Sequence, residues 1–205
     1  MKYYIKNNTL IIKGKFEALS SGVNGGRASV VSIINHQVQP DFNHKQPAEY
    51  LNCLADTLNI PEPFFGLLTA VSMDNLCVST EDYLTAFVTA GVTHPSPFKF
   101  DNSVKYLKSK ELSELSKIGT INIILVVKGI LSEGAMVGAV ITATEAKALT
   151  LLDIGCDFVG TTTDAVIVAY ENQPALYLEY AGSGTEFGDK IVKTVSTGIK
   201  ESLRL

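Results

Sequence analysis

The sequence predicts an α+β fold, a single layered domain with a mixed or largely antiparallel sheet of about eight strands and about three packed helices. The β-rich runs cluster before and after one long helical segment instead of alternating with helices one for one. The chain has 205 residues, of which 46% are hydrophobic, which suffices for one substantial core. No repeat, charge block or low-complexity stretch divides it, so residues 1–205 are expected to form one domain.

The first part of the chain is predicted to be mostly strand. The turn pair Asn7-Asn8 separates two β-rich runs within residues 3–12, which is typical of a hairpin. Residues 16–38 then predict a strand, a glycine-rich loop and a second strand. Segment 47–58 has apolar residues at helical spacing after a proline suited to the first turn, so a short helix is expected there.

Three further apolar runs predict strands at 64–71, 83–93 and 120–128. The polar stretch 99–117 between the last two is expected to be a helix or a surface loop.

The clearest helix begins after Ser132, a suitable N-cap, and stops before Gly155. Its helical period predicts one buried face, formed by Val137, Val140, Ile141, Thr144, Ala148, Leu151 and Leu152.

The last part of the chain predicts two strands and a closing helix. The strands are expected at 164–170 and 175–181, side by side across a short turn near Asn172 to Pro174. Segment 186–203 predicts an amphipathic helix with its apolar face at Ile191, Val192, Val195 and Ile199.

Composition disfavours nucleic acid and membrane as partners. Seventeen Lys and Arg stand against 21 Asp and Glu, a formal net charge of −4. The longest apolar runs, 64–71 and 121–127, are shorter than the roughly 20 residues needed to cross a bilayer. The first residues show no secretory signal, so we expect a cytoplasmic protein.

Cysteine and histidine spacing indicates neither a disulfide framework nor a metal motif. Three cysteines lie far apart without a CxxC pair, so reduced and mostly buried thiols are expected. His36, His44 and His94 lack the spacing of a helical metal pair. We therefore expect no metal, with a site assembled in space as the alternative.

Four segments contain residues suited to chemistry, each with a plain structural alternative. The loop Ser20–Arg27 contains three glycines, which either expose backbone N–H groups to a ligand or simply form a tight turn. In Val159–Val166, three threonines and Asp164 precede an apolar strand, and they either activate a water or nucleophile or form a capping cluster. Tyr180–Gly188 is a glycine-rich turn where Thr185 either caps the helix or borders an anion site. Glu145 is either a general base at a cleft edge or a solvated carboxylate.

Seven stretches, in this order along the chain, resemble the adenosylcobinamide amidohydrolase family. They are ALSSGVNGG at 18–26, GLLTAVSM at 66–73, FVTAGVTHP at 87–95, GTINIILVV at 119–127, AMVGAVITATEAKALTLLDIG at 135–155, GTTTDAVIVA at 160–169 and YAGSGTEFGDKI at 180–191. The long helix with TEAK, followed by the TTDA strand, is the most specific part of the resemblance.

The resemblance implies hydrolysis of the amide that joins the corrin ring's propionyl arm to aminopropanol in adenosylcobinamide. The products would be adenosylcobyric acid and aminopropanol, which serves corrinoid salvage for cobalamin synthesis. The corrinoid is then the substrate, and no cofactor is expected. The alternatives are a non-catalytic corrinoid-binding protein and a hydrolase that processes itself at a bond such as Gly160-Thr161. Whether the chain forms a homo-oligomer stays open.

The resemblance and the needs of amide hydrolysis together suggest roles for these loops. Either Asp164 or Glu145 is expected to be the general base, with Thr161 and Thr163 orienting water or substrate. Backbone N–H groups of the Asn24-Gly25-Gly26 loop would stabilise the oxyanion. Covalent catalysis by a serine or threonine is the competing mechanism. The residues expected to bind the substrate are Ser20, Ser21, Asn24, Gly25, Gly26, Thr69, His94, Thr185 and Glu186.

Overall fold

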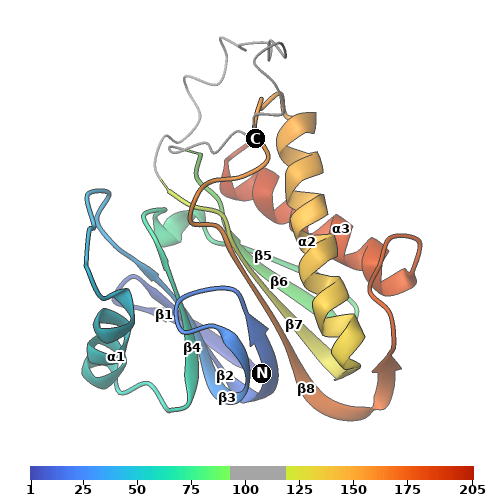
Figure 1. Ribbon diagram of the computed structural model, residues 1–205, viewed down its shortest axis with the longest axis horizontal. Helices are drawn as coiled ribbons and strands as arrows, with labels where there is room; N and C mark the ends of the chain where they lie inside the picture. Colours follow the sequence, from blue (N-terminus) through green and yellow to red (C-terminus); the bar gives the residue numbers. More distant parts are fainter. Residues whose placement is uncertain (93–118) are drawn as a thin grey trace.

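The computed structural model describes residues 1–92 and 119–205. In these residues, eight strands form one sheet and three α-helices cover it (Figure 1). The strands are β1 (Lys2–Lys6), β2 (Thr9–Ser20), β3 (Gly26–Gln37), β4 (Phe64–Thr69), β5 (Cys77–Glu81), β6 (Leu84–Thr89), β7 (Asn122–Leu131) and β8 (Ala165–Leu178). The helices are α1 (Pro47–Leu58), α2 (Glu133–Asp153) and α3 (Glu186–Ser202), with a 3-10 turn at Met73–Asn75.

The sheet is mixed and has the order β4-β3-β2-β8-β7-β6-β5, with β1 paired to the first part of β2. Two neighbouring pairs are parallel, β3 with β4 and β7 with β8, and the other pairs are antiparallel. Each parallel pair is joined by a helix, α1 in the first case and α2 in the second. The predicted α+β class with a mixed sheet is therefore confirmed.

The sheet curls so that its two halves face each other. β3 and β7 are three places apart in the strand order, which in a flat sheet would separate them by about 14 Å. Yet Asn122 at the start of β7 donates from Nδ2 to Oδ1 of Asn35 in β3, at 3.0 Å. The rings of Tyr3 in β1 and Phe87 in β6 also meet edge to face. The curled sheet thus encloses an apolar cluster contributed by both of its halves.

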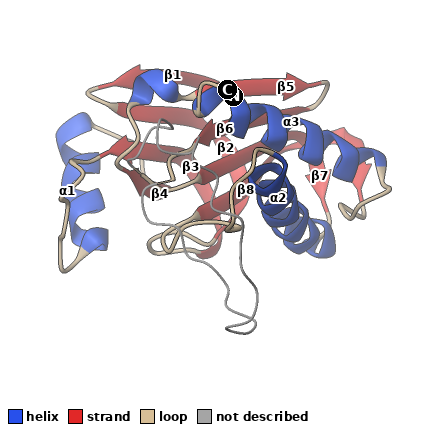
Figure 2. Cartoon of the chain, turned by 90° about the horizontal axis from the view of Figure 1, so that it is seen from above, coloured by secondary structure: helices blue, strands red, loops and turns tan. Residues whose placement is uncertain are grey.

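Helices cover the outer surface of the curl on opposite sides (Figures 1 and 2). α1 buries Leu51, Ala55 and Leu58 against Ile11 and Ile34 of the N-terminal half. α2 and α3 pack together over the strands of the C-terminal half, where they close the largest apolar cluster.

Most of the locally encoded elements form where they are predicted. Asn7 and Asn8 both have positive φ, as a two-residue hairpin turn requires, and the helix at 47–58 is α1. Ser132 caps α2 by accepting from the N–H of Ala135, and Gly155 follows the helix with φ of +87°. The strand β5 is an addition that the sequence analysis missed. The predicted segment 99–117 lies outside the described residues.

The predicted pair of strands at 164–170 and 175–181 is wrong, because the chain does not reverse near Asn172. A single strand, β8, runs through this region. Its first part pairs with β7 up to Gly129 opposite Asn172, and pairing resumes with Ile130 opposite Tyr177. The intervening residues bulge outward, and Gly129 provides the space, since a Cβ there would lie 3.1 Å from the side chain of Leu176.

The predicted buried face of α2 is also wrong. Val137, Ile141 and Leu152 are each at least half exposed. The buried face instead consists mainly of small side chains, with Met136, Lys147 and Leu151 as its larger members: Ala135, Met136, Ala139, Thr142, Ala143, Ala146, Lys147, Thr150 and Leu151. Small residues allow the helix to lie close to both α3 and the sheet. Among the described helices, α2 is long and apolar enough to span a membrane, but half of that window is buried in the fold.

Candidate active site

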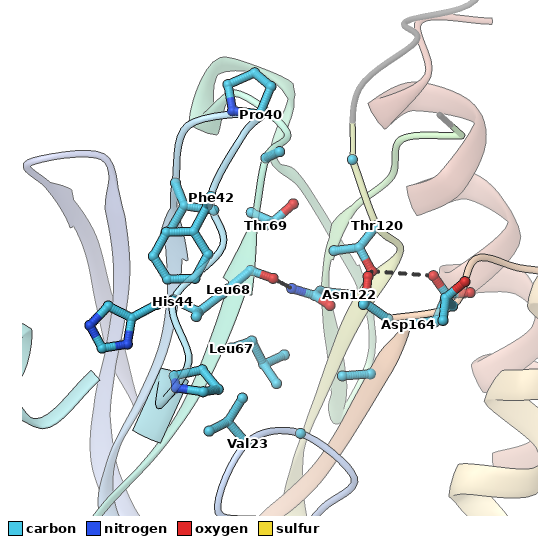
Figure 3. Close-up of a pocket in the computed structure, with 18 of the residues that line it drawn as sticks. Val23, Pro40, Phe42, His44, Leu67, Leu68, Thr69, Thr120, Asn122 and Asp164 are labelled. Carbon is cyan, nitrogen blue, oxygen red and sulfur yellow. Dashed lines mark hydrogen bonds between the residues drawn. The ribbon is translucent and has the colours of Figure 1, made fainter. Parts of the chain in front are cut away.

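A pocket of about 610 Å³ opens where five chain segments meet at one end of the curled sheet. These are the loop after β2, the connection from β3 to α1, the end of β4, the start of β7 and the loop before β8. Figure 3 shows two unlike walls, with Pro40, Phe42 and His44 on one side and Thr120 and Asp164 on the other. The pocket therefore pairs an apolar wall with a polar one.

Asp164 is the central group of the polar wall. Its Oδ1 accepts from the backbone N–H of Ile121 at 2.8 Å and from the hydroxyl of Thr161 at 2.5 Å. Oδ2 accepts from the backbone N–H of Thr161 at 2.9 Å. The hydroxyl of Thr120 lies 3.4 Å from Oδ1. The segment that leads into β7 and the loop before β8 thus hold this carboxylate in one orientation.

Lys147 completes the environment of Asp164 from the buried face of α2. Its Nζ lies 2.5 Å from Oδ2 of Asp164, and the side chains are only 11% and 9% exposed. Loss of one partner of an ion pair buried in this way strongly destabilises the fold, because the other charge is left buried and unpaired. The pair therefore fixes both α2 and the loop before β8 relative to the pocket.

Gly160 leaves the space in which Lys147 and Asp164 form their ion pair. A Cβ at this position would lie 2.6 Å from Oδ2 of Asp164 and 2.6 Å from Nζ of Lys147. Any side chain at position 160 would push the two partners apart.

The apolar wall rests on a buried histidine. His36 contacts the hydroxyl of Thr9 through Nδ1 at 2.7 Å and the hydroxyl of Tyr50 through Nε2 at 3.0 Å. The ring of Tyr50 packs edge to face on Phe42, which in turn stacks on His44. Burial lowers the pKa of His36 below its ordinary value of 6.5, so the neutral imidazole is favoured in the fold.

A buried amide network forms the floor between the two walls. Asn122 donates from Nδ2 to the backbone oxygen of Leu68 and to Oδ1 of Asn35, both at 3.0 Å. Asn35 in turn donates to the hydroxyl of Thr89. This network ties β3, β4, β6 and β7 together directly beneath the pocket.

The cysteines take no part in this site. Burial, reinforced by Glu201, raises the pKa of Cys77 to about 12. Burial raises the pKa of Cys156 to about 11, so both thiols stay protonated at neutral pH. Cys53 is exposed, and all three are free. In residues 1–92 and 119–205, no group of three or more His, Cys, Asp or Glu side chains is arranged to bind a metal.

The pocket brings together four residues from the predicted site, Ser21, Thr69, Thr163 and Asp164. Thr161 does not line the pocket; it is buried and donates a hydrogen bond to Asp164.

The other predicted residues lie outside the pocket lining. Ser20 is buried, and its Oγ accepts from the N–H of Gly22. Glu145 is exposed on α2. Asn24, Gly25 and Gly26 occupy the exposed tip of their loop, while the pocket is lined by residues 21–23.

Thr185 and Glu186 lie at the opposite end of β8 from the pocket. Thr185 caps α3 by accepting from the N–H of Gly188, and Glu186 pairs with Lys190. His94 lies outside the described residues.

Sequence reasoning missed Lys147, Thr120 and the apolar wall. Lys147 could have been noticed as one of few charged residues in an otherwise apolar helix. Thr120 had only its place before an apolar strand as a signal. Nothing local indicated the wall at 38–44, because its position depends on how β3 and β4 curl toward β7.

The pocket thus contains a buried carboxylate that accepts several hydrogen bonds and lies beside several hydroxyl groups. Enzymes that hydrolyse acyl bonds have sites of this type. Comparison with known sequences gives the family. The sequence profile of adenosylcobinamide amidohydrolases matches residues 2–205, and the chain belongs to that family.

Three relatives show how widely the chain's similarity extends. An adenosylcobinamide amidohydrolase of Methanosarcina mazei is 50% identical over 213 residues, covering all of this chain and 98% of the relative. One of Halobacterium salinarum is 29% identical, over 90% of this chain and 79% of the relative. An uncharacterised protein of Methanocaldococcus jannaschii is also 29% identical, over 97% and 86%. No solved structure matches the chain.

Proposed function

We propose that this pocket hydrolyses the amide between the corrin ring's propionyl arm and aminopropanol in adenosylcobinamide. The products are adenosylcobyric acid and aminopropanol. The family supports the reaction, and the observation that supports this pocket as its site is Asp164, a fixed carboxylate on the wall of a pocket lined with hydroxyl groups. The reaction belongs to cobinamide salvage in the cytoplasm, with the corrinoid as substrate and no separate cofactor.

Asp164 acts as the general base in this proposal. Amide hydrolysis requires a group that takes a proton from the attacking oxygen and later returns one to the leaving amine. Asp164 faces the pocket, whereas the competing candidate, Glu145, is exposed elsewhere on α2. Lys147 and Thr161 are positioning residues, because they hold the carboxylate without lining the pocket.

The pocket size fits one arm of the substrate better than the whole corrinoid. A volume of about 610 Å³ suits a drug-sized ligand, and a corrin ring with its adenosyl group is considerably larger. The aminopropanol arm therefore enters between Phe42 and Asp164, and the ring rests at the mouth. The apolar wall contacts the arm's hydrocarbon part, and the polar wall contacts its amide.

The test incubates purified protein with adenosylcobinamide in dim light and follows the corrinoid by mass spectrometry. Wild-type protein is expected to form adenosylcobyric acid, and Asp164→Asn is expected to lower kcat by at least about 10²-fold through loss of the base. Asp153→Asn, an exposed carboxylate at the end of α2, is the matched control and retains full rate.

Two results would contradict the proposal. Bound but unchanged cobinamide would make the wild-type chain a corrinoid-binding protein. A large loss in Glu145→Gln with full activity in Asp164→Asn would move the base to α2.

A further inference from the structure

Thr120 differs from the other hydroxyl groups that line the pocket. Among the described residues, it is the pocket-lining hydroxyl within hydrogen-bond distance of Asp164. The Oγ of Ser21 accepts from the N–H of Val166, and that of Thr69 accepts from the N–H of Val71. Thr163 bonds to Thr120 rather than to the carboxylate. Thr120 thus lies beside the proposed base on the pocket wall, within hydrogen-bond distance of its carboxylate.

The direction of each hydrogen bond follows from counting protons. A hydroxyl group has one proton to donate. Thr161 gives its proton to Oδ1 of Asp164, its nearest acceptor at 2.5 Å, and Thr163 gives its own to Oγ1 of Thr120 at 3.0 Å. The proton of Thr120 then has Oδ1 of Asp164 as its acceptor, at 3.4 Å. Removal of that proton leaves an oxygen that Thr163 already stabilises by donation.

The backbone around Thr120 holds this oxygen in place. Thr120 lies two residues before β7 and is only 4% exposed. The next residue, Ile121, donates its N–H to the same Oδ1 of Asp164, so the carboxylate and the hydroxyl are attached to one short stretch of chain. A β-branched side chain has few χ1 alternatives, which limits movement of Oγ1 further.

We propose that Oγ1 of Thr120 is the nucleophile of the reaction, an inference that rests on the proposed function. Oγ1 attacks the carbonyl carbon of the substrate amide, and its proton passes to Asp164 as the new C–O bond forms. The C–N bond then breaks, and Asp164 returns that proton to the nitrogen of aminopropanol. The corrinoid acid is left as an ester on Thr120.

Water completes the cycle through the same two groups. Asp164 takes a proton from a water molecule that attacks the ester carbonyl, and the C–O bond to Thr120 breaks. Asp164 gives its proton back to Oγ1, and adenosylcobyric acid leaves with the oxygen of the water. No oxidant, reductant or further reactant is needed.

The first test compares three threonine substitutions. Thr120→Val removes the hydroxyl at nearly constant volume and is expected to lower kcat by at least about 10³-fold. Thr120→Ser keeps a hydroxyl and is expected to retain activity within about tenfold of wild type. Thr144→Val, on the exposed side of α2, is the control for the same substitution away from the pocket. A folded Thr120→Val enzyme with a rate within tenfold of wild type would overturn the proposal.

The second test uses wild-type protein and does not depend on how a variant folds. Hydroxylamine is added at increasing concentration, and corrinoid hydroxamate and corrinoid acid are measured. Adenosylcobinamide and an analogue with ethanolamine in place of aminopropanol are expected to give the same product ratio, because both form the same ester. A ratio that changes with the leaving amine would show direct attack by water. If wild-type protein releases no aminopropanol at all, the proposed function fails instead.

Discussion

The two strand–helix–strand units of this chain use their helices in opposite ways. α1, which joins β3 to β4, lies at the periphery and buries its larger apolar side chains, such as Leu51 and Leu58. α2, which joins β7 to β8, is packed by the sheet and by α3, and it buries mainly small side chains together with Lys147. Large apolar residues thus mark the buried face of a peripheral helix. On a helix that packs against both the sheet and a neighbouring helix, small residues mark the buried face, and the charge that a site needs can be placed among them.

The largest effect is expected from removing the buried charge of α2. Lys147→Met leaves Asp164 without its cationic partner, so we expect at least about 10²-fold lower kcat and about 3–5 kcal/mol lower free energy of unfolding. Steady-state kinetics and urea unfolding measure the two effects. Gly160→Ala keeps both charges but places a Cβ between them, so it should reproduce the loss of kcat.

The control for this prediction is Gly134→Ala in the first turn of α2, where a Cβ has no neighbour closer than 3.7 Å. Full activity in Lys147→Met would show that the ion pair is not needed to position Asp164.

A cavity in the α1 unit is expected to affect stability without affecting chemistry. Leu51 is 2% exposed, and Leu51→Ala should lower the free energy of unfolding by about 2–5 kcal/mol. Because α1 supplies none of the polar wall, kcat of the folded fraction should stay within about twofold of wild type. Kinetics below the unfolding transition, set beside Lys147→Met, separate the two units. A loss of kcat as large as that of Lys147→Met would erase the distinction between them.

The sequence specified the locally encoded parts of the molecule well. Asn7-Asn8, Pro47 and Ser132 act through neighbours a few residues away, so turn and cap patterns were enough to place them. The continuity of β8 depends on its pairing with β7, and the buried face of α2 depends on α3. Thr120 and Lys147 belong to the site only because the fold brings residues 120, 147 and 164 together. Local patterns found Asp164 and its neighbour Thr161 and could not find the two partners distant in sequence, Thr120 and Lys147.

The buried face of α2 offers a direct comparison of the two interpretations of that helix. Ile141 is 52% exposed, so Ile141→Ser should change the free energy of unfolding by less than about 0.5 kcal/mol. Ala143 is fully buried, and Ala143→Leu should destabilise by about 1–3 kcal/mol through overpacking. Urea unfolding of both variants distinguishes the two interpretations of the buried face. The apolar periodicity of the sequence predicts the reverse order.

A pH-dependent effect is expected from His36, which supports the apolar wall on the α1 side. Its pKa in the fold lies below the ordinary value of 6.5, so in that interval the unfolded chain binds a proton that the folded chain does not. Above pH 6.5 proton binding by His36 does not affect stability. Below pH 6.5 it lowers the free energy of unfolding as the pH drops, by at most about 1.4 kcal/mol per pH unit. His36→Gln should remove that part of the slope. The free energy of unfolding, measured with urea between pH 5 and 7.5, should therefore converge for variant and wild type at low pH. Parallel curves of this free energy against pH would mean that His36 is protonated in the fold.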